Sequence, residues 1–329
     1  MGLPIDLACW NYDRTRALVD GRVAVEGVDL NYIAMEMPES FHRMLRHAEF
    51  HVSEMSFAWY LGSVFAERRH MVAIPVFPSR MFRHSGIYVN SKSGITDPAD
   101  LVGKRIGVPE YQQTAGVWIR GMLADDYGVP IDSVSYHQGG LTEPGRVESA
   151  LRRPEGIELT PIGPQDTLSD MLERGEIDAL YTAHAPVGFE AGSSHVERLF
   201  PDYRREEQAY YQRTGIFPIM HTVVIRMDVL EAHPWLARSL MKAFEEAKAY
   251  ALADLFEPAA AKCSLPWLVA EAEATEDAFG TRDFWPYGVE QNRHVIETFV
   301  RYTHEQGLVP ERPSVEDLFP RSTMDIARI

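Results

Sequence analysis

Short runs rich in β-branched residues alternate with amphipathic stretches along most of this chain, and this alternation limits the fold more than any other feature. Residues 5–9, 104–109 and 177–181 have the composition of short strands, and residues 114–127 form a predicted helix that Gly128 ends. A strand–helix–strand rhythm is typical of a parallel or mixed sheet covered by helices. We therefore predict an α/β fold.

The character of the chain changes after residue 90, where a polar, proline-containing stretch opens a short helix. Residues 91–215 then keep the strand–helix rhythm, which predicts an inserted α/β lobe. The flanking segments 1–90 and 216–329 are expected to form the other lobe together, and a length of 329 residues suits two lobes of roughly 100–200 residues each. A chain that crosses twice between lobes leaves a cleft, which is a usual place for a ligand.

The acidic composition argues against two kinds of partner. The sequence has 32 Lys and Arg against 48 Asp and Glu, a net charge of −16, and such a surface repels nucleic acid and anionic lipid. No apolar stretch approaches the roughly 20 residues that a membrane helix needs. We expect neither a nucleic-acid nor a membrane partner, and an anionic ligand would need a local cationic pocket.

The first residues lack a basic and apolar leader, so a cytoplasmic protein is expected.

Familiar cofactor and metal motifs are missing from the sequence. It contains no GxxxxGK[ST], no GxGxxG, no HExxH and no GxSxG. Cys9 and Cys263 stand far apart without a second Cys or a His at ligand spacing, so two buried thiols are expected rather than a zinc site. We predict no metal site, while ligands drawn from distant segments remain open.

Cationic side chains gather between two expected strands. Arg80, Arg83 and His84 stand within five residues in a predicted loop over residues 77–85, which is unusual in so acidic a chain. Arginine recognises a carboxylate through two parallel hydrogen bonds and keeps its charge when desolvated, so this cluster is a candidate carboxylate clamp. A solvated basic turn is the plainer alternative.

Two helix starts supply further candidate ligand-binding residues. Glu54 and Ser56 stand at a strand-to-helix junction, and the helix there is predicted over residues 55–68. Tyr111 precedes and Thr114 opens the helix over residues 114–127. The free N–H groups in the first turn of a helix favour an anion. Helix capping would explain Ser and Thr at these positions equally well.

Histidines and aromatic residues at predicted strand boundaries complete the candidates. His184 follows the strand over residues 177–181, and ligands bind at the carboxyl ends of strands in open α/β sheets. His221 precedes another predicted strand. Trp285 and Tyr287 lie in an aromatic loop, where they either pack as core or flank a ring-shaped ligand. A lone His is more often structural than catalytic, so these roles rest on position.

Several of these segments together carry a resemblance to a known family. In chain order they are FHVSEMSFAWYL (50–61), IPVFPSRMFRHSGIYVN (74–90), LVGKRIGVPEYQQTAGVWIRGML (101–123), IDALYTAHAP (177–186), GIFPIMHTVVIR (215–226) and FWPYGVEQNRHVIETFVRY (284–302). The sequence resembles the 4,5-dihydroxyphthalate decarboxylase family. Members of that family are similar to the substrate-binding proteins of ABC transporters with the type II periplasmic-binding fold.

The resemblance implies a two-lobed, type II periplasmic-binding-protein-like fold and an enzyme. The implied reaction, part of phthalate catabolism, removes one carboxylate from 4,5-dihydroxyphthalate and gives protocatechuate and CO₂. Deprotonation of the hydroxyl para to the leaving carboxylate raises the electron density at the carboxylated carbon. A general acid then protonates that carbon, and CO₂ leaves as aromaticity returns. This route needs a base, an acid and a cationic seat for the retained carboxylate, but no electron-sink cofactor.

Each candidate residue then has an expected role in such a decarboxylase. His184 and His221 are the expected proton-transfer groups, with His84 as a third candidate, because an unperturbed His has a pKa near 6.5. The expected substrate-binding residues are Arg80 and Arg83 on the carboxylates, Thr114, Ser56 and Tyr111 near the helix starts, Trp285 and Tyr287 beside the ring, and Glu54 orienting a His or a hydroxyl.

Two other classes of function stay open at this point. A solute-binding protein for an aromatic carboxylate, of the kind that serves ABC transporters, would use the same clamp and aromatic residues without any chemistry. A ligand-sensing domain of a regulator is less favoured, because the sequence has no appended helix-turn-helix and its charge opposes DNA binding. In every case the partner is a small aromatic carboxylate, and assembly into a homo-oligomer is left open.

Overall fold

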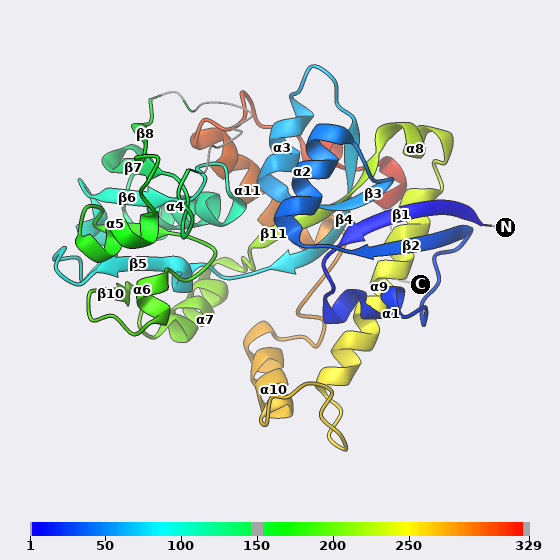
Figure 1. Ribbon diagram of the computed structural model, residues 1–329. Helices are drawn as coiled ribbons and strands as arrows, with labels where there is room; N and C mark the ends of the chain where they lie inside the picture. Colours follow the sequence, from blue (N-terminus) through cyan, green and yellow to red (C-terminus); the bar gives the residue numbers. More distant parts are fainter. Residues whose placement is uncertain (1, 146–153, 155, 325–329) are drawn as a thin grey trace.

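The computed structural model describes residues 2–145, 154 and 156–324, and in them the chain builds two separate β-sheets (Figure 1). One sheet has the strand order β2-β1-β3-β11-β4, and the other has the order β10-β5-β9-β6-β7-β8. The strands of the first sheet are β1 (Leu3–Cys9), β2 (Val28–Ala34), β3 (Val52–Ser56), β4 (Met71–Arg80) and β11 (Ile219–Arg226). Those of the second are β5 (Ile87–Asn90), β6 (Arg105–Val108), β7 (Ser135–Gln138), β8 (Leu159–Pro161), β9 (Ala179–Tyr181) and β10 (Val196–Arg198).

Helices surround both sheets (Figure 1). Beside the five-stranded sheet lie α1 (Arg16–Val19), α2 (Met37–His47), α3 (Phe57–Val64), α8 (Met227–Ala232) and α9 (Leu236–Leu255). Beside the six-stranded sheet lie α4 (Thr114–Tyr127), α5 (Leu168–Arg174), α6 (Val187–Glu190) and α7 (Tyr203–Thr214). The later helices are α10 (Leu268–Phe279), α11 (Arg293–Glu305) and α12 (Val315–Leu318). The short 3-10 helices are η1 (Asp13–Thr15), η2 (His84–Gly86), η3 (Pro98–Leu101), η4 (Ile131–Ser133), η5 (Glu290–Asn292) and η6 (Arg321–Thr323). Within the described ranges, no helix combines the length and the apolar character needed to span a bilayer.

The predicted α/β fold is confirmed, and one helix has the predicted bounds. Helix α4 covers residues 114–127, because Gly128, with a φ of +66°, adopts the left-handed conformation that ends it. Three local predictions were wrong. Met55 belongs to β3 rather than to a helix over residues 55–68, and the Cys263 thiol is exposed. Arg80 ends β4 instead of lying in a loop.

Strand β4 includes residues 77–80, which were predicted to lie in a loop. Pro75 and Pro78 are tolerated because β4 is an edge strand, where a missing N–H is accommodated. Among the described strands it pairs with β11 alone. Register irregularities in the β4–β11 ladder accompany the two prolines. Several β4 carbonyls instead accept hydrogen bonds from outside the sheet, as Pro75 O does from the N–H of Gly288 at 2.8 Å. The late segment around Gly288 is thereby fixed to β4.

The chain passes between the sheets along two adjacent segments. One leads from β4 to β5 and the other from α7 to β11, and the N–H of Met81 donates to Pro218 O at 3.1 Å between them. Strand β5 begins at Ile87 and pairs with β9 and β10. Residues 87–90 therefore belong to the six-stranded sheet, although segment 1–90 was expected to lie wholly in the other lobe.

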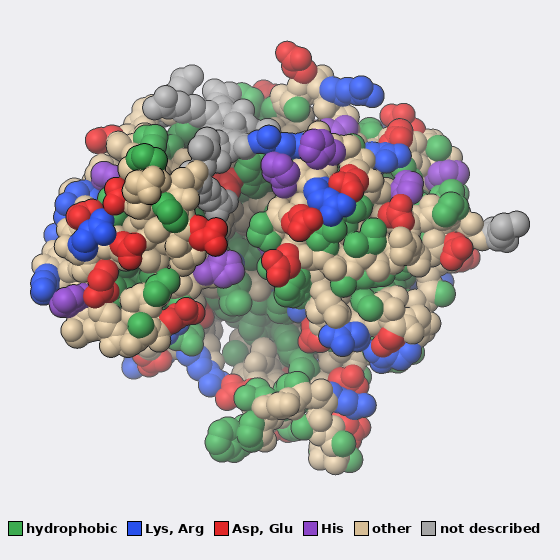
Figure 2. All heavy atoms as spheres, in the orientation of Figure 1, with side chains coloured by type: hydrophobic (Ala, Val, Ile, Leu, Met, Phe, Trp, Pro, Cys, Tyr) green, Lys and Arg blue, Asp and Glu red, His purple; other side chains and the backbone are tan. Residues whose placement is uncertain are grey.

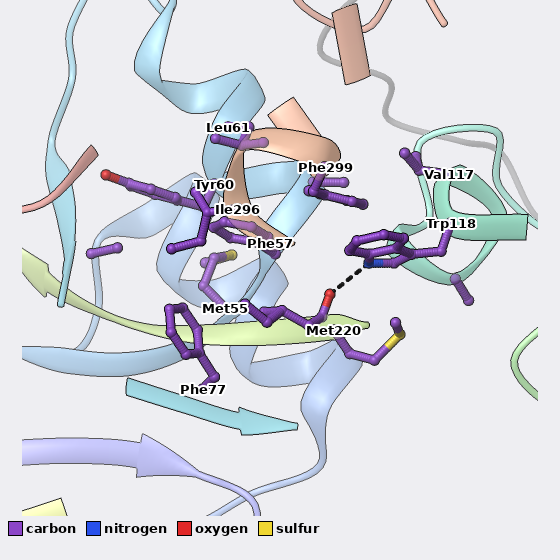
Figure 3. Packing of buried hydrophobic residues seen from close by; sticks show 14 of the residues in the cluster. Met55, Phe57, Tyr60, Leu61, Phe77, Val117, Trp118, Met220, Ile296 and Phe299 are labelled. Carbon is purple, nitrogen blue, oxygen red and sulfur yellow. Dashed lines mark hydrogen bonds between the residues drawn. The ribbon is translucent and has the colours of Figure 1, made fainter. Parts of the chain in front are cut away.

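An aromatic core joins helices from the two halves. Phe57 of α3 stacks on Phe299 of α11 with ring centroids 5.1 Å apart, and Trp118 of α4 stacks on Phe299 at 5.0 Å. Figure 3 shows these rings turned toward one another, with Trp118 Nε1 donating to the carbonyl of Ile219 at 2.8 Å. Buried aromatic rings each remove some 150–250 Å² from water, so this cluster binds the halves together. On the face in Figure 2 the surface is hollowed between the halves, and hydrophobic side chains line the lower part of the hollow.

Candidate functional site

The carboxyl ends of β1 and β3 meet at the border between the two halves. The two strands are parallel neighbours, so both end at the same edge of the sheet, which is where ligands bind in such sheets. Ser56, at the end of β3, lies with its Oγ 2.9 Å from Oγ1 of Thr114, the first residue of α4. Thr114 Oγ1 also accepts the N–H of Ala58 at 3.1 Å. These hydroxyls bring the first turns of α3 and α4 together across the border, and Ser56 caps α3.

Glu54 of β3 and His221 of β11 form a hydrogen-bonded pair at this edge. Nδ1 of His221 lies 2.7 Å from Oε1 of Glu54; the carboxylate is fully buried, and the His side chain is 14% exposed. His221 stands opposite Ser56 in the β3–β11 ladder, and side chains two residues apart share a face, so Glu54 and His221 lie on the same face. Register irregularities flank His221 on its β4 side, and such bulges re-aim side chains.

The buried carboxylate of Glu54 accepts from four donors. Oε1 takes the Nδ1–H of His221 and the hydroxyl of Tyr12, each at 2.7 Å. Oε2 takes the N–H of Trp10 at 3.0 Å and the thiol of Cys9 at 3.4 Å. Burial by itself raises the pKa of Glu54, but the hydrogen bond and charge of His221, with those from Trp10 and Tyr12, outweigh it and hold the pKa below its ordinary value. Glu54 is therefore an anion at neutral pH.

An ionised partner fixes the tautomer of His221. A carboxylate can only accept, so Nδ1 of His221 must carry the hydrogen, and Nε2 is the atom left to exchange a proton with a ligand. Within the described ranges Nε2 makes no hydrogen bond. A partly exposed His backed by a buried carboxylate is the arrangement of a general acid or base.

Sequence analysis missed the segment that follows β1. Trp10 and Tyr12 hold Glu54, and Arg14 lies with its guanidinium carbon 4.1 Å from the ring centroid of Tyr12. The signal was present, since these residues directly follow a predicted strand. The rule that selected His184 at the end of its strand would have selected them too.

Arg80 has its guanidinium buried among protein acceptors. Nη1 donates to Phe217 O at 2.9 Å, and Nη2 donates to Pro286 O at 2.8 Å and to Oδ1 of Asn292. Burial lowers the pKa of Arg80 to about 9, which leaves it a cation at neutral pH. These contacts tie β4 to the segments before β11 and before α11, so Arg80 has a structural role whether or not it also meets a ligand.

Arg83 is held differently from Arg80. Among the described residues, its Nε and Nη2 donate to Sδ of Met220 alone, at 3.2 and 2.9 Å, and a thioether is a weak acceptor. Burial lowers the pKa of Arg83 to about 10, while the charge of Glu207 acts to raise it. Arg83 therefore remains a cation with hydrogen-bonding capacity to spare.

His84 lies in an aromatic cage rather than beside the Glu54–His221 pair. The rings of Phe200, Tyr210 and Tyr127 surround it at centroid distances of 5.2, 5.3 and 6.0 Å. Its two ring nitrogens are buried and make no hydrogen bond in the described part of the chain. Burial, followed by the charge of Arg213, lowers the pKa of His84 to about 4, so the ring is neutral at pH 7.

The remaining predicted residues occupy three different places. Trp285 is half-buried, and its Nε1 donates to Phe77 O at 2.9 Å. Tyr287 is buried nearby. Tyr111 is buried under Arg120, whose guanidinium carbon lies 3.9 Å from its ring centroid. His184 is exposed after β9, and no contact joins its ring to His221 within the ranges described. The structure thus joins Glu54, His221, Ser56 and Thr114 but leaves His184, His84 and Tyr111 apart.

No group of three or more His, Cys, Asp or Glu side chains that could hold a metal ion is found in the part of the chain that the structure describes.

No family model matches the chain. The chain is 40% identical over 328 residues to the 4,5-dihydroxyphthalate decarboxylase of Comamonas testosteroni, which covers 99% of both proteins. It is also 40% identical over 211 residues to the protein of the same name from Pseudomonas putida, covering 64% of this chain and 82% of that one.

Periplasmic binding proteins are among the solved structures with a similar fold. The periplasmic aliphatic sulphonate binding protein SsuA from Escherichia coli matches with a TM-score of 0.55 and 13% identity, over 98% of this chain and 99% of that one. A putative periplasmic sulfonate-binding protein from Methylobacillus flagellatus matches with a TM-score of 0.55 and 12% identity, over 97% and 91% of the two chains. These likenesses confirm the predicted two-lobed type II fold.

Proposed function

Because the chain belongs to the 4,5-dihydroxyphthalate decarboxylase family, we propose that it converts 4,5-dihydroxyphthalate to protocatechuate and CO₂, with His221 as the proton donor. As a member of this family it is a carboxy-lyase. The observation that supports the assignment to His221 is its pairing with the buried, ionised Glu54 at the border of the halves. The fold alone is shared with binding proteins and does not distinguish catalysis from capture.

The proposed reaction breaks one carbon–carbon bond and forms one carbon–hydrogen bond. Loss of the proton from the hydroxyl para to the leaving carboxylate gives a phenolate that carries electron density to the carboxylated carbon. The Nε2–H of His221 protonates that carbon, the ring becomes a dienone, and CO₂ departs as the ring regains aromaticity. Glu54 stabilises the imidazolium before the transfer and holds Nδ1–H throughout. The phenolate then takes up a proton, so the reaction consumes one proton overall.

The first proton needs a second group, because His221 must already be protonated when it acts. His184 remains the candidate base for the phenol, since it is exposed and follows the end of β9 in the other half of the molecule. That role rests on position and not on a contact. It places the base and the acid on opposite halves, so both would reach a ring bound between them.

The carboxylate clamp expected at Arg80 and Arg83 divides into two cases. Arg80 already donates to three protein acceptors, whereas Arg83 donates to a thioether alone in the part of the chain that the structure describes. A buried guanidinium gains most from a ligand anion when its protein acceptors are weak. We therefore assign ligand binding to Arg83 and a structural tie to Arg80.

One assay tests the proposed function directly. The protein is incubated with 4,5-dihydroxyphthalate in D₂O, with and without EDTA, and CO₂ and the ring protons of the product are followed. We expect CO₂ release, protocatechuate as product, and deuterium at the ring carbon that lost its carboxylate. Tight binding of the ligand without CO₂ release would contradict the proposal and favour a binding protein.

A further inference from the structure

Arg14 is fixed beside the Glu54–His221 pair by aromatic contacts. It belongs to η1, the first turn after β1, and its guanidinium carbon lies 4.1 Å from the ring centroid of Tyr12 and 4.2 Å from that of Trp285. Two ring faces attract a guanidinium and restrict its position. The cation is therefore placed before any ligand arrives.

The hydrogen bonds of Arg14 leave part of its donor fork unused. Nε donates to Pro78 O, one of the β4 carbonyls beside the irregular ladder, and Nη1 donates to Asp13 at 2.9 Å. The Asp13 side chain is 60% exposed, so this ion pair is weak. Nη2 makes no hydrogen bond to residues 2–145, 154 or 156–324. The side chain is 15% exposed, so part of it reaches the surface.

Contacts connect this cation to the proposed proton donor. The ring of Tyr12, which carries Arg14 on its face, donates its hydroxyl to Oε1 of Glu54 at 2.7 Å. The same oxygen accepts Nδ1–H of His221 at 2.7 Å. Arg14 and His221 are thus linked through Tyr12 and Glu54 at the same edge of the five-stranded sheet.

A second unpaired donor lies in the same region. Tyr287 is 4% exposed, and its hydroxyl has no hydrogen-bond partner in the part of the chain described. Burial raises the pKa of Tyr287, and the charge of Arg14 is the first among the ionic groups to act on it, in the opposite direction. A buried hydroxyl without an acceptor costs free energy that a ligand oxygen would recover.

We propose that Arg14 binds the carboxylate that the substrate retains, with the Tyr287 hydroxyl as a second donor. This inference rests on the proposed function, because it assigns one group of the same substrate. It adds a cation that the sequence analysis did not name, and it gives Trp285 the role of positioning Arg14 instead of stacking directly on the substrate ring.

The retained carboxylate fits this site better than the leaving one. A tight ion pair on the leaving carboxylate would stabilise the ground state and oppose the loss of its charge as CO₂. The retained carboxylate keeps its charge through the reaction, so an ion pair with it stabilises the bound substrate and the transition state equally. Removal of Arg14 should therefore raise KM and leave kcat nearly unchanged.

The test compares ligands that differ by this one carboxylate. Protocatechuate carries the retained carboxylate, and catechol is the same ring without it. Inhibition of CO₂ release by each is measured for the unmutated protein, Arg14→Met, Arg14→Lys and Tyr287→Phe. The control is Arg22→Met, because Arg22 also pairs with a neighbouring aspartate and lies over a tyrosine ring, yet its side chain is 46% exposed.

The expected result is a carboxylate-specific loss. For Arg14→Met the inhibition constant of protocatechuate and the KM should rise tenfold or more, since a charge-assisted hydrogen bond is lost. The inhibition constant of catechol should change less than about twofold. Arg14→Lys should recover part of the loss, Tyr287→Phe should show a smaller loss, and Arg22→Met should show none.

The outcomes separate this inference from the proposed function. Equal weakening of both inhibitors by Arg14→Met would indicate a structural role and overturn the inference. Unchanged KM and protocatechuate inhibition in a folded Arg14→Met protein would overturn it as well. If the unmutated protein released no CO₂ from 4,5-dihydroxyphthalate, the proposed function would fail, and direct titration of protocatechuate against catechol would still decide whether Arg14 binds a carboxylate.

Discussion

Replacement of Glu54 by Gln removes the negative charge behind His221 and keeps the size and shape of the side chain. The side chain is fully buried on β3 and accepts from His221, Tyr12, Trp10 and Cys9. An amide has one oxygen and one NH₂ group, so the NH₂ must face donors where an acceptor oxygen stood. One or two of the four donors then lose their acceptor.

The size of the effect follows from these contacts. A buried donor left unsatisfied costs about 1–3 kcal/mol, so we expect Glu54→Gln to lower the free energy of unfolding by roughly 2–4 kcal/mol. Catalysis should suffer more, because the imidazolium loses its counter-charge and the Nδ1–H its acceptor. A positioned acid typically supplies about 10²–10⁴ in rate, so kcat should fall by at least about 10².

The pH dependence gives the sign of the stability effect. The pKa of Glu54 is lower in the folded protein than its ordinary value, so its charge stabilises the fold above that ordinary value. This contribution is lost as the pH falls through the lowered pKa. Urea unfolding at several pH values should therefore show a large gap between unmutated protein and Glu54→Gln at pH 7 that narrows in acid.

Glu173→Gln is the matched control, because Glu173 accepts Nδ1 of His195 at 3.1 Å in a partly exposed pair on the six-stranded half. We expect its kcat to stay within about twofold of the unmutated value. A Glu54→Gln protein that is folded and keeps kcat within threefold would refute the role given to the carboxylate.

Three further predictions follow from the cationic cluster around β4 and β5. Arg80→Met should lower the free energy of unfolding by about 3 kcal/mol or more in urea titrations, because three buried acceptors lose their donor. The KM of the folded protein should change little. A tenfold change in KM without loss of stability would contradict the structural role of Arg80. Arg83→Met should raise the KM for the dicarboxylate tenfold or more in steady-state kinetics. Its free energy of unfolding in urea should fall by less than about 1 kcal/mol. The folded pKa of His84, about 4, lies below its unfolded value near 6.5, so its contribution to stability falls as the pH drops between these values. Between pH 7 and pH 5 the free energy of unfolding should therefore fall by about 2 kcal/mol less in His84→Phe than in the unmutated protein. An equal fall in both proteins would show that His84 does not cause this pH dependence.

The sequence predicted best what local signals decide. Helix α4 ends at a glycine, Gly128, and both its bounds were predicted. Residues 77–80 were predicted as loop, but they belong to β4, whose prolines are tolerated because the strand lies at the sheet edge. Arg80 was therefore predicted to lie in a basic loop, whereas it is buried at the end of β4 and holds two other segments by hydrogen bonds.

The site was predicted residue by residue but not as an arrangement. Glu54 and His221 were both named, yet they stand 167 residues apart, and only the β3–β11 register makes them partners. Arg14 was not named, because its contact with Trp285 joins residues that are far apart in the sequence. His84 was included because it follows two arginines, whereas the packing of α7 and α4 encloses it in aromatic rings.

The central claim is that Nε2 of His221 delivers the proton that replaces CO₂, and His221→Asn tests it most directly. The variant keeps a polar side chain of similar size on β11 and removes proton transfer near neutral pH. The measurement is kcat for CO₂ release from 4,5-dihydroxyphthalate, alongside the dissociation constant of protocatechuate, with His195→Asn as the control. The account predicts that kcat falls by about 10² or more in His221→Asn while the dissociation constant changes little, and that His195→Asn keeps full turnover. Full turnover by a folded His221→Asn protein would contradict the account.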